Sequence, residues 1–207
     1  MRTVLIPAGT YHLGWRFDLS SEAQDGVDRT VASFGQSRQQ FLSECFSPER
    51  VVVLDAFEIQ AEPIKHILDF VPVQDRQRMV DYASMSEIID NVLRSTGWRL
   101  PTEDEFEAAA GGTLFLWGDE VPLGKPRREN LHRGRGPNGL TLPHWDYQKE
   151  LVNGAFKMGD GGCLGCSGAS WPSTWLLMSP TSRVPANIIN ENWITFLEEA
   201  WVHPVRI

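Results

Sequence analysis

The segment Trp98-Arg-Leu-Pro-Thr-Glu-Asp-Glu-Phe-Glu-Ala-Ala-Ala-Gly-Gly112 is the most informative stretch of this 207-residue chain. Thr102 followed by Glu105 matches a capping box, in which the hydroxyl accepts from the N3 amide and the carboxylate accepts from the cap amide. Acidic residues in the first turns suit the positive end of the helix dipole, and the two glycines end the helix. The segment therefore predicts a short helix from residue 103, with carboxylates that serve capping rather than catalysis.

Apolar residues upstream of this segment recur at helical spacing. The spacing predicts one helix over 61–71 and a second over about 75–94. We expect both apolar stripes to face a hydrophobic core, because positions three and four residues apart lie on one side of a helix. The stripe residues are Ile64, Ile67, Leu68 and Val71 in the first helix, and Met79, Tyr82, Met85, Ile89 and Val92 in the second.

The N-terminal half also contains strand-like segments and one long polar stretch. Thr3–Ile6 and Tyr11–Leu13 flank Pro-Ala-Gly, which predicts a short hairpin. Arg50–Ile59 has the β-branched composition of a strand. Residues 16–49 are rich in Ser, Gln, Asp and Arg, so we expect a polar insertion or mobile loop there. After residue 112 no long helix is indicated and no linker is visible, which predicts one domain over 1–207.

Composition narrows the class of protein. The chain is 42% hydrophobic and 22% charged, which excludes a disordered chain, a coiled coil and a collagen-like repeat. Eight tryptophans, 18 glycines and 13 prolines favour a turn-rich fold with an aromatic core. Backbone carbonyls in such a fold need donors, so we expect Arg99 and also Trp117 to be structural. Apolar runs reach only four residues, no secretory signal is visible, and three cysteines make no disulfide framework, which predicts a cytoplasmic protein without membrane contact.

The net charge of −8 is unevenly distributed. Residues 1–110 hold 18 Asp and Glu against 10 Lys and Arg, whereas 111–207 hold 9 of each. An acidic protein is a poor ligand for nucleic acid, so nucleic acid is not an expected partner. The local exception is Lys125–Arg135, with five cations and one anion. It is interpreted either as a solvated loop or as a site for an acidic partner.

Seven segments match, in order, the motifs of one family. They are Leu5–Gly14, Val53–Ile59, Arg99–Glu107, Leu116–Glu120, Asn130, Asn138–Leu140 and Val205–Ile207. Through them the chain resembles the formylglycine-generating-enzyme (sulfatase-modifying factor) domain family. The resemblance implies an α+β, C-type-lectin-like fold with a small twisted antiparallel sheet, two to three helices and much irregular structure. Because one fold hosts many roles, function has to be argued from site residues.

Copper-dependent oxidases of that family hold Cu(I) with two thiolates that are separated by four residues and follow a Gly-Gly-Ser-aromatic turn, since soft sulfur ligands select Cu(I). If Gly161-Gly162 is this turn, Cys166 and Trp171 occupy the two thiolate positions. If the turn is the one that ends at Trp171, which keeps the Ser-aromatic pair and is preferred, Ser173 and Met178 occupy them. The thiolate pair is incomplete in either register.

Cys163 and Cys166 nevertheless form a Cys-x-x-Cys in a glycine-rich loop. They are the candidate catalytic and metal-binding cysteines, able to bind a soft metal, to cycle as a redox dithiol, or simply to pack as buried thiols. Where the family binds calcium, Asp146 and Glu150 are the available carboxylates, so they are the candidate calcium ligands together with backbone carbonyls. Cys45 lies in the polar segment and is interpreted as incidental.

Two functional hypotheses follow. The first is a binding or accessory domain that has lost the oxidase chemistry and offers an arginine- and tryptophan-lined surface to a protein, peptide or small-molecule ligand. The second is a copper-dependent oxidase that acts on a thiol or peptide substrate through Cys163 and Cys166. Iron-dependent sulfoxide synthesis is disfavoured, because that class takes its iron histidines from a separate helical domain. The candidate partner-binding residues are Arg127, Arg128, Arg133, Arg135, Trp171 and Trp175.

Overall fold

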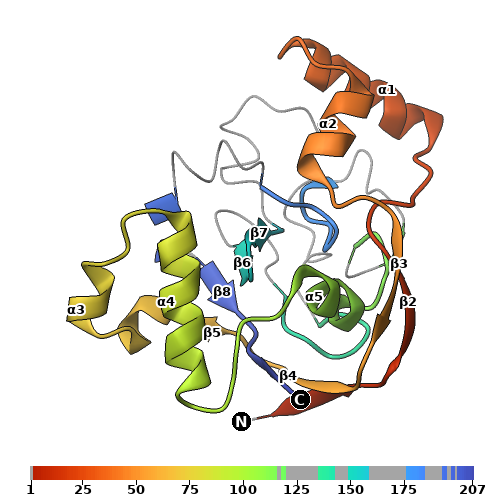
Figure 1. Ribbon diagram of the computed structural model, residues 1–207. Coiled ribbons are helices and arrows are strands. Elements are labelled where there is room, and N and C mark those ends of the chain that lie inside the picture. Colours follow the sequence, from red (N-terminus) through yellow and green to blue (C-terminus); the bar gives the residue numbers. More distant parts are fainter. Residues whose placement is uncertain are drawn as a thin grey trace.

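The computed structural model describes residues 2–115, 118–119, 135–142, 149–158, 176–184, 193–194, 197–198 and 200–207 (Figure 1). Over these residues the protein is a mixed α+β structure with small, mainly antiparallel sheets and few helices. The fold class expected from the sequence is confirmed at this level. None of the described helices is long and apolar enough to cross a membrane.

A long two-stranded ribbon begins at the N-terminus. β1 (Thr3–Ile6) pairs antiparallel with β4 (Phe57–Gln60), and β2 (Gly9–Leu13) pairs antiparallel with β3 (Arg50–Leu54). The register is the same in both pairs, so the four strands form one ribbon with a break near residues 7–8 and 55–56. The predicted hairpin is therefore wrong in its pairing, although both of its strands exist. The predicted strand over residues 50–59 is confirmed as β3 and β4.

The C-terminal residues contribute one strand to this ribbon and one strand to a second sheet. β9 (Val205–Arg206) pairs with β4, so the two chain ends lie near each other in Figure 1. The second sheet has the order β5 (Ile64–Lys65), β8 (Ala200–Val202), β6 (Lys149–Val152) and β7 (Ala155–Lys157). Its one parallel pair joins β6 to β8. The last residues of the chain thus connect strands from both halves of the sequence.

The polar stretch 16–49 is not a loop. It contains α1 (Ser21–Ala32) and α2 (Arg38–Cys45), which form a helical hairpin at the top of Figure 1. Ser20 and Ser37 cap the two helices by accepting hydrogen bonds from main-chain amides. A narrow apolar stripe, Ala23, Val27 and Val31 with Phe41, packs into a core cluster with Phe46, Phe115 and Met178. The polar composition concealed a stripe of residues four apart, which is enough to bury one face of a helix.

The helix predicted over 61–71 is also wrong. Residues 64–65 form β5, and only Ile67–Phe70 form a helix, a short 3₁₀ turn η1. His66 adopts the left-handed conformation with φ 58°, which is incompatible with a continuous α-helix. Ile67 and Val71 are nevertheless buried in the core, so the apolar pattern marked core residues without identifying their backbone conformation.

The long helix predicted over 75–94 is divided into α3 (Val73–Arg76) and α4 (Tyr82–Arg94). Asp81 starts the second helix, because its side chain accepts from the Ser84 amide in a reciprocal capping box. Met85 and Ile89 are buried as expected, whereas Val92 is only partly buried. α5 (Glu103–Ala110) is confirmed with its predicted cap.

α5 lies on the inner side of the ribbon (Figure 1). The Thr102 hydroxyl accepts from the Glu105 amide at 3.1 Å, and the Glu105 carboxylate accepts from the Thr102 amide at 2.8 Å. Phe106 and Ala109 are buried against Ile59 in a second core cluster. This position places the glutamates of α5 next to the second sheet, where they meet the charged residues described below.

Candidate functional site

Most of the sequence-predicted site residues lie outside the described part of the chain. They are Cys163, Cys166, Asp146, Arg127, Arg128, Arg133, Trp171 and Trp175, and the predicted structural residue Trp117 also belongs to this group. Among the described residues, no group of three or more His, Cys, Asp and Glu side chains could hold a metal ion. Arg135 and Glu150 are the two candidates whose contacts can be followed.

Arg135 is bound within its own fold. Its guanidinium forms an ion pair with Glu62 and donates to the Gly139 carbonyl at 3.0 Å. The Arg2 guanidinium donates to the same carbonyl at 2.7 Å. Arg135 therefore connects the turn at residues 136–139 to the strand region near Glu62, and a partner would compete with these contacts.

Glu150 is fully buried on β6 and is paired with His203. The His203 amide donates to one carboxylate oxygen at 2.7 Å, and the ring Nδ1 contacts the other at 2.8 Å. Both side chains have no solvent exposure. Burial raises the pKa of Glu150, although the contacts with His203 oppose this effect. Glu150 therefore already accepts one contact from His203 at each carboxylate oxygen, and its predicted calcium partner Asp146 lies outside the described residues.

This arrangement fixes the orientation of the histidine ring. When Glu150 is ionised its carboxylate can only accept a hydrogen bond, so Nδ1 then carries the proton that faces Glu150. The other ring nitrogen, Nε2, has no hydrogen-bond partner among the described residues. Sequence reasoning missed His203, since nothing along the chain connects it to a residue 53 positions earlier.

A second buried charge lies one strand away. The Lys157 side chain on β7 is fully buried, and its ammonium donates to Glu103 and Glu107 at 2.7 Å each. It also lies 3.3 Å from the Ser47 hydroxyl and 3.4 Å from the Thr181 carbonyl. A buried ammonium needs acceptors for its three donors, and this set supplies them.

Two arginines extend the Lys157 cluster toward the surface. Arg50 pairs with Asp104 at 2.5 Å and with Glu107 at 3.4 Å, and Arg183 pairs with Glu103 at 2.9 Å. Burial by itself would raise the pKa of Glu107, but attraction to Lys157 and hydrogen bonds from Lys157 and Ser47 outweigh it, so the pKa is lowered. The cluster is structural in its geometry, because it ties α5 to β3, β7 and residues 181–183. The one feature of the sequence that indicated this cluster was the pair of glutamates four residues apart on α5.

Arg99 fulfils the structural role expected of it. Its guanidinium forms two hydrogen bonds to Glu105, at 2.7 and 2.5 Å, and donates to the Leu100 carbonyl at 3.0 Å. Burial raises the pKa of the Cys45 thiol to about 12, which keeps the thiol protonated at neutral pH and lowers its reactivity.

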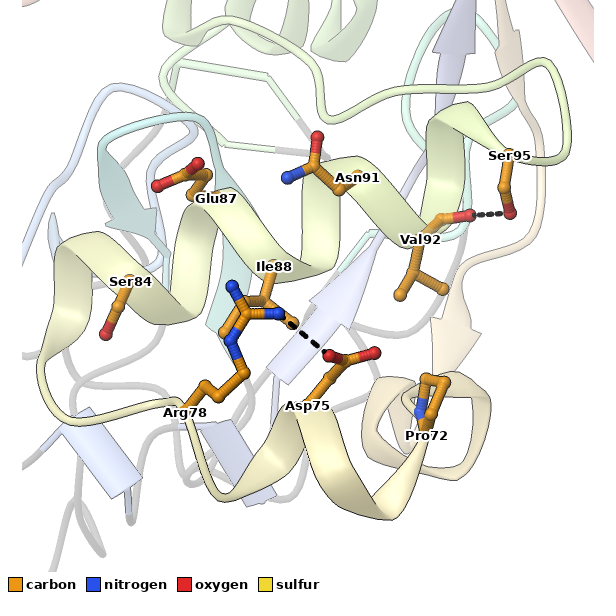
Figure 2. Close-up of a pocket in the computed structure, with 9 residues that line it drawn as sticks. All are labelled: Pro72, Asp75, Arg78, Ser84, Glu87, Ile88, Asn91, Val92 and Ser95. Atoms are coloured by element: carbon orange, nitrogen blue, oxygen red, sulfur yellow. Dashed lines mark hydrogen bonds and ion pairs between the residues drawn. The ribbon is translucent and has the colours of Figure 1, made fainter.

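A groove lies along α3 and α4, on the side of the molecule away from β2 and β3 in Figure 1. It has a volume of about 390 Å³ (Figure 2). Ile88 and Val92 form its apolar base and point toward α3 in Figure 2. The lining residues are Pro72, Asp75, Arg78, Ser84, Glu87, Ile88, Asn91, Val92 and Ser95.

Polar side chains border this base on two sides. On the α3 side, Arg78 and Asp75 form an ion pair at 3.1 Å (Figure 2). On the other side, Glu87 and Asn91 point away from α3, and no side-chain partner of either is found among the described residues. The described lining therefore combines an apolar base, Ile88 and Val92, with six polar residues around it.

No protein-family model and no curated protein matches this sequence. The resemblance found in the motifs therefore remains a prediction, and function has to be argued from the geometry above.

Proposed function

We propose that this protein is a non-catalytic binding or accessory domain on a C-type-lectin-like scaffold, and that it binds a polypeptide partner in the groove along α3 and α4. The observation that carries the proposal is the groove itself, with Ile88 and Val92 half-buried at its base and Glu87 and Asn91 beside them, neither of which has a side-chain partner among the described residues. A side chain that is left half-buried in the free protein gains further burial when a partner covers it. The scaffold part of the proposal rests on the ordered sequence motifs.

The charged side chains of the described residues support binding rather than catalysis. Glu107 is paired with the buried Lys157 and with Arg50, and Glu105 is paired with Arg99. A general acid or base must reach a substrate from a cleft, and these groups are instead occupied by internal partners. Glu87 and Asn91 on α4 lie outside these clusters and have no side-chain partner in the part of the chain that the structure describes.

Site-specific photocrosslinking tests the proposal. A benzoylphenylalanine at the exposed position Asn91 should capture a defined polypeptide in cells, and the adduct should be lost when Val92→Asp is added. The matched control places the same crosslinker at Gln39, an exposed position on α2. Adducts that persist with Val92→Asp in a folded protein, or that form equally from Gln39, would contradict the proposal.

A copper-dependent oxidase is the second candidate, and the Cys163-x-x-Cys166 sequence is the feature that favours it. Two thiolates three positions apart should capture Cu(I) in preference to Ca²⁺ or Mg²⁺, with affinity that falls at low pH because both sulfurs must lose a proton. A Cu(I) titration against a competing chelator, on wild type, Cys163→Ser and Cys166→Ser, measures this. Stoichiometric copper that disappears in both variants, with turnover of a thiol peptide, would replace the binding proposal by the oxidase.

A further inference from the structure

The backbone around the groove indicates which kind of segment it can receive. Within the part of the chain that the structure describes, the lining residues come from α3, α4 and the turns that adjoin them. The described lining therefore offers side chains, and it includes no strand edge. An extended peptide gains most of its affinity from main-chain hydrogen bonds to such an edge, whereas a helix satisfies its own backbone. The geometry favours a helical occupant.

The apolar base has the spacing that suits a helix. Ile88 and Val92 are four residues apart on α4, which separates them by about 6 Å along the helix axis. Both are partly buried against the main core, so their outer surface is what remains for a partner. Apolar residues four apart on an incoming helix have the same spacing and can pack along this row.

The polar borders define the charge of the occupant. The described lining of the groove contains two carboxylates, Asp75 and Glu87, and one cation, Arg78. Arg78 already pairs with Asp75, and its side chain is 73% exposed, so this pair stays at the border. Glu87 has no partner among the described residues, and the half of the chain that contains it carries the whole acidic excess. A segment that complements the charge of this groove therefore carries a positive charge.

We infer that the groove binds one amphipathic helix of a partner protein, with apolar side chains four residues apart against Ile88 and Val92 and a Lys or Arg against Glu87. This inference rests on the proposed binding function and specifies its partner. Recognition combines burial along the apolar row with charge selection at its border.

A defined helical probe tests it. A phage-displayed library, in which one helix of a small helical-bundle scaffold is randomised, is selected against the full chain. We expect binders with two apolar residues four apart and an adjacent Lys or Arg. In fluorescence anisotropy, Glu87→Lys should weaken the best binder by about fivefold and Val92→Asp by about tenfold or more. The affinity should also fall with added salt.

Glu49→Lys is the matched control, because it makes the same charge change at an exposed position near β3, away from α4 (Figure 1). It should leave the affinity unchanged. Glu87 is exposed, so its variant tests the groove without disturbing the core. Selection of no helix, or of helices that ignore both groove variants, would overturn the inference. Groove-specific crosslinks from position 91 would then still support the binding function, and their absence would remove that as well.

Discussion

At the scale of single residues, Glu150 shows how a carboxylate is accommodated in the interior. Transfer of an ionised carboxylate out of water is costly unless hydrogen bonds replace its hydration. His203 provides two such bonds, one from its amide and one from its ring. Glu150 was predicted as a calcium ligand because the family resemblance places a calcium loop there, in which Asp146 and Glu150 are the available carboxylates. The direction of its side chain depends on how β6 pairs with its neighbours, which the sequence does not state.

The tautomer of His203 makes this pair testable. In Glu150→Gln, the amide oxygen can still accept from the His203 amide, and the amide N–H₂ can donate to Nδ1 if the ring proton moves to Nε2. We therefore expect a modest loss of stability with a switch of tautomer, seen in the ¹⁵N shifts of the ring. Glu150→Ala leaves two buried donors unpaired and should cost about 1–3 kcal/mol for each. Equal costs for the two variants, with an unchanged tautomer, would contradict this account.

Lys157 permits a sharper energetic test. Lys157→Met leaves Glu107 buried without its main partner, and loss of one member of a buried pair costs about 3–5 kcal/mol. Adding Glu107→Gln should recover part of this loss, because the uncompensated charge is removed while an acceptor for the Gly14 amide is kept. Urea unfolding of the double-mutant cycle measures the coupling. The control is Lys65→Met, because Lys65 is exposed and its ammonium lies over the Trp201 ring. This substitution should lower the free energy of unfolding by less than about 1 kcal/mol. If the effects of the substitutions at Lys157 and Glu107 are additive, the two residues are not coupled.

At the scale of elements, the features that depend on neighbouring residues were predicted correctly, whereas the features that depend on distant residues were not. The Thr102 capping box and the terminal Gly111 were predicted correctly, because both are set by residues a few positions apart. The helix over 61–71 failed at His66, whose left-handed backbone has no signature in an apolar pattern. The break before α4 did have a signal, the Asp81 cap, but the longer apolar periodicity masked it. The loop alternative for residues 16–49 was wrong because the apolar residues four positions apart in α1 are few and stand in a mainly polar sequence, whereas the insertion alternative stays a prediction.

The end of α5 can be tested with a pair of glycines. Gly111 has φ 98°, and a Cβ there would lie 2.9 Å from the Pro137 ring. Gly97 has φ 81° with nothing within 4 Å of an added Cβ. Gly97→Ala should therefore cost only the left-handed conformation, about 1–2 kcal/mol. Gly111→Ala should cost more, since Pro137 must also move. Thermal unfolding compares them, and a Gly111→Ala loss no greater than that of Gly97→Ala would show that the Pro137 contact is not limiting.

At the scale of the whole molecule, closure of the fold depends on pairings between distant segments. The N-terminal strands pair with residues 50–60, and β9 then pairs with β4. Strand propensity identified these segments but not their partners, because many pairings satisfy the same alternation of apolar residues. The groove was missed for a related reason. It requires α3 to fold back beside α4, and a single continuous helix was predicted in their place.

Buried carboxylates give the whole molecule a pH dependence with two opposing contributions. Hydrogen bonds from Arg99 lower the pKa of Glu105 against the effect of burial, and Lys157 lowers that of Glu107. Below the unfolded value of 4.5, the unfolded state therefore binds more protons than the folded state, and stability is lost as the pH falls. Glu150 acts in the other direction, because its folded pKa lies above 4.5. In the window above 4.5 the folded state holds the extra proton, so stability falls as the pH rises.

We therefore expect the free energy of unfolding to rise with pH up to the region of 4.5 and then to decline as Glu150 ionises in the folded protein. Each group changes the slope by at most about 1.4 kcal/mol per pH unit. Urea unfolding followed by tryptophan fluorescence, from about pH 3 to about pH 8, measures the curve. Glu150→Gln should remove the decline and keep the rise, whereas Glu107→Gln should weaken the rise and keep the decline. A wild-type curve that climbs through neutral pH and is unchanged by Glu150→Gln would mean that His203 stabilises the Glu150 carboxylate enough to offset the cost of burying it.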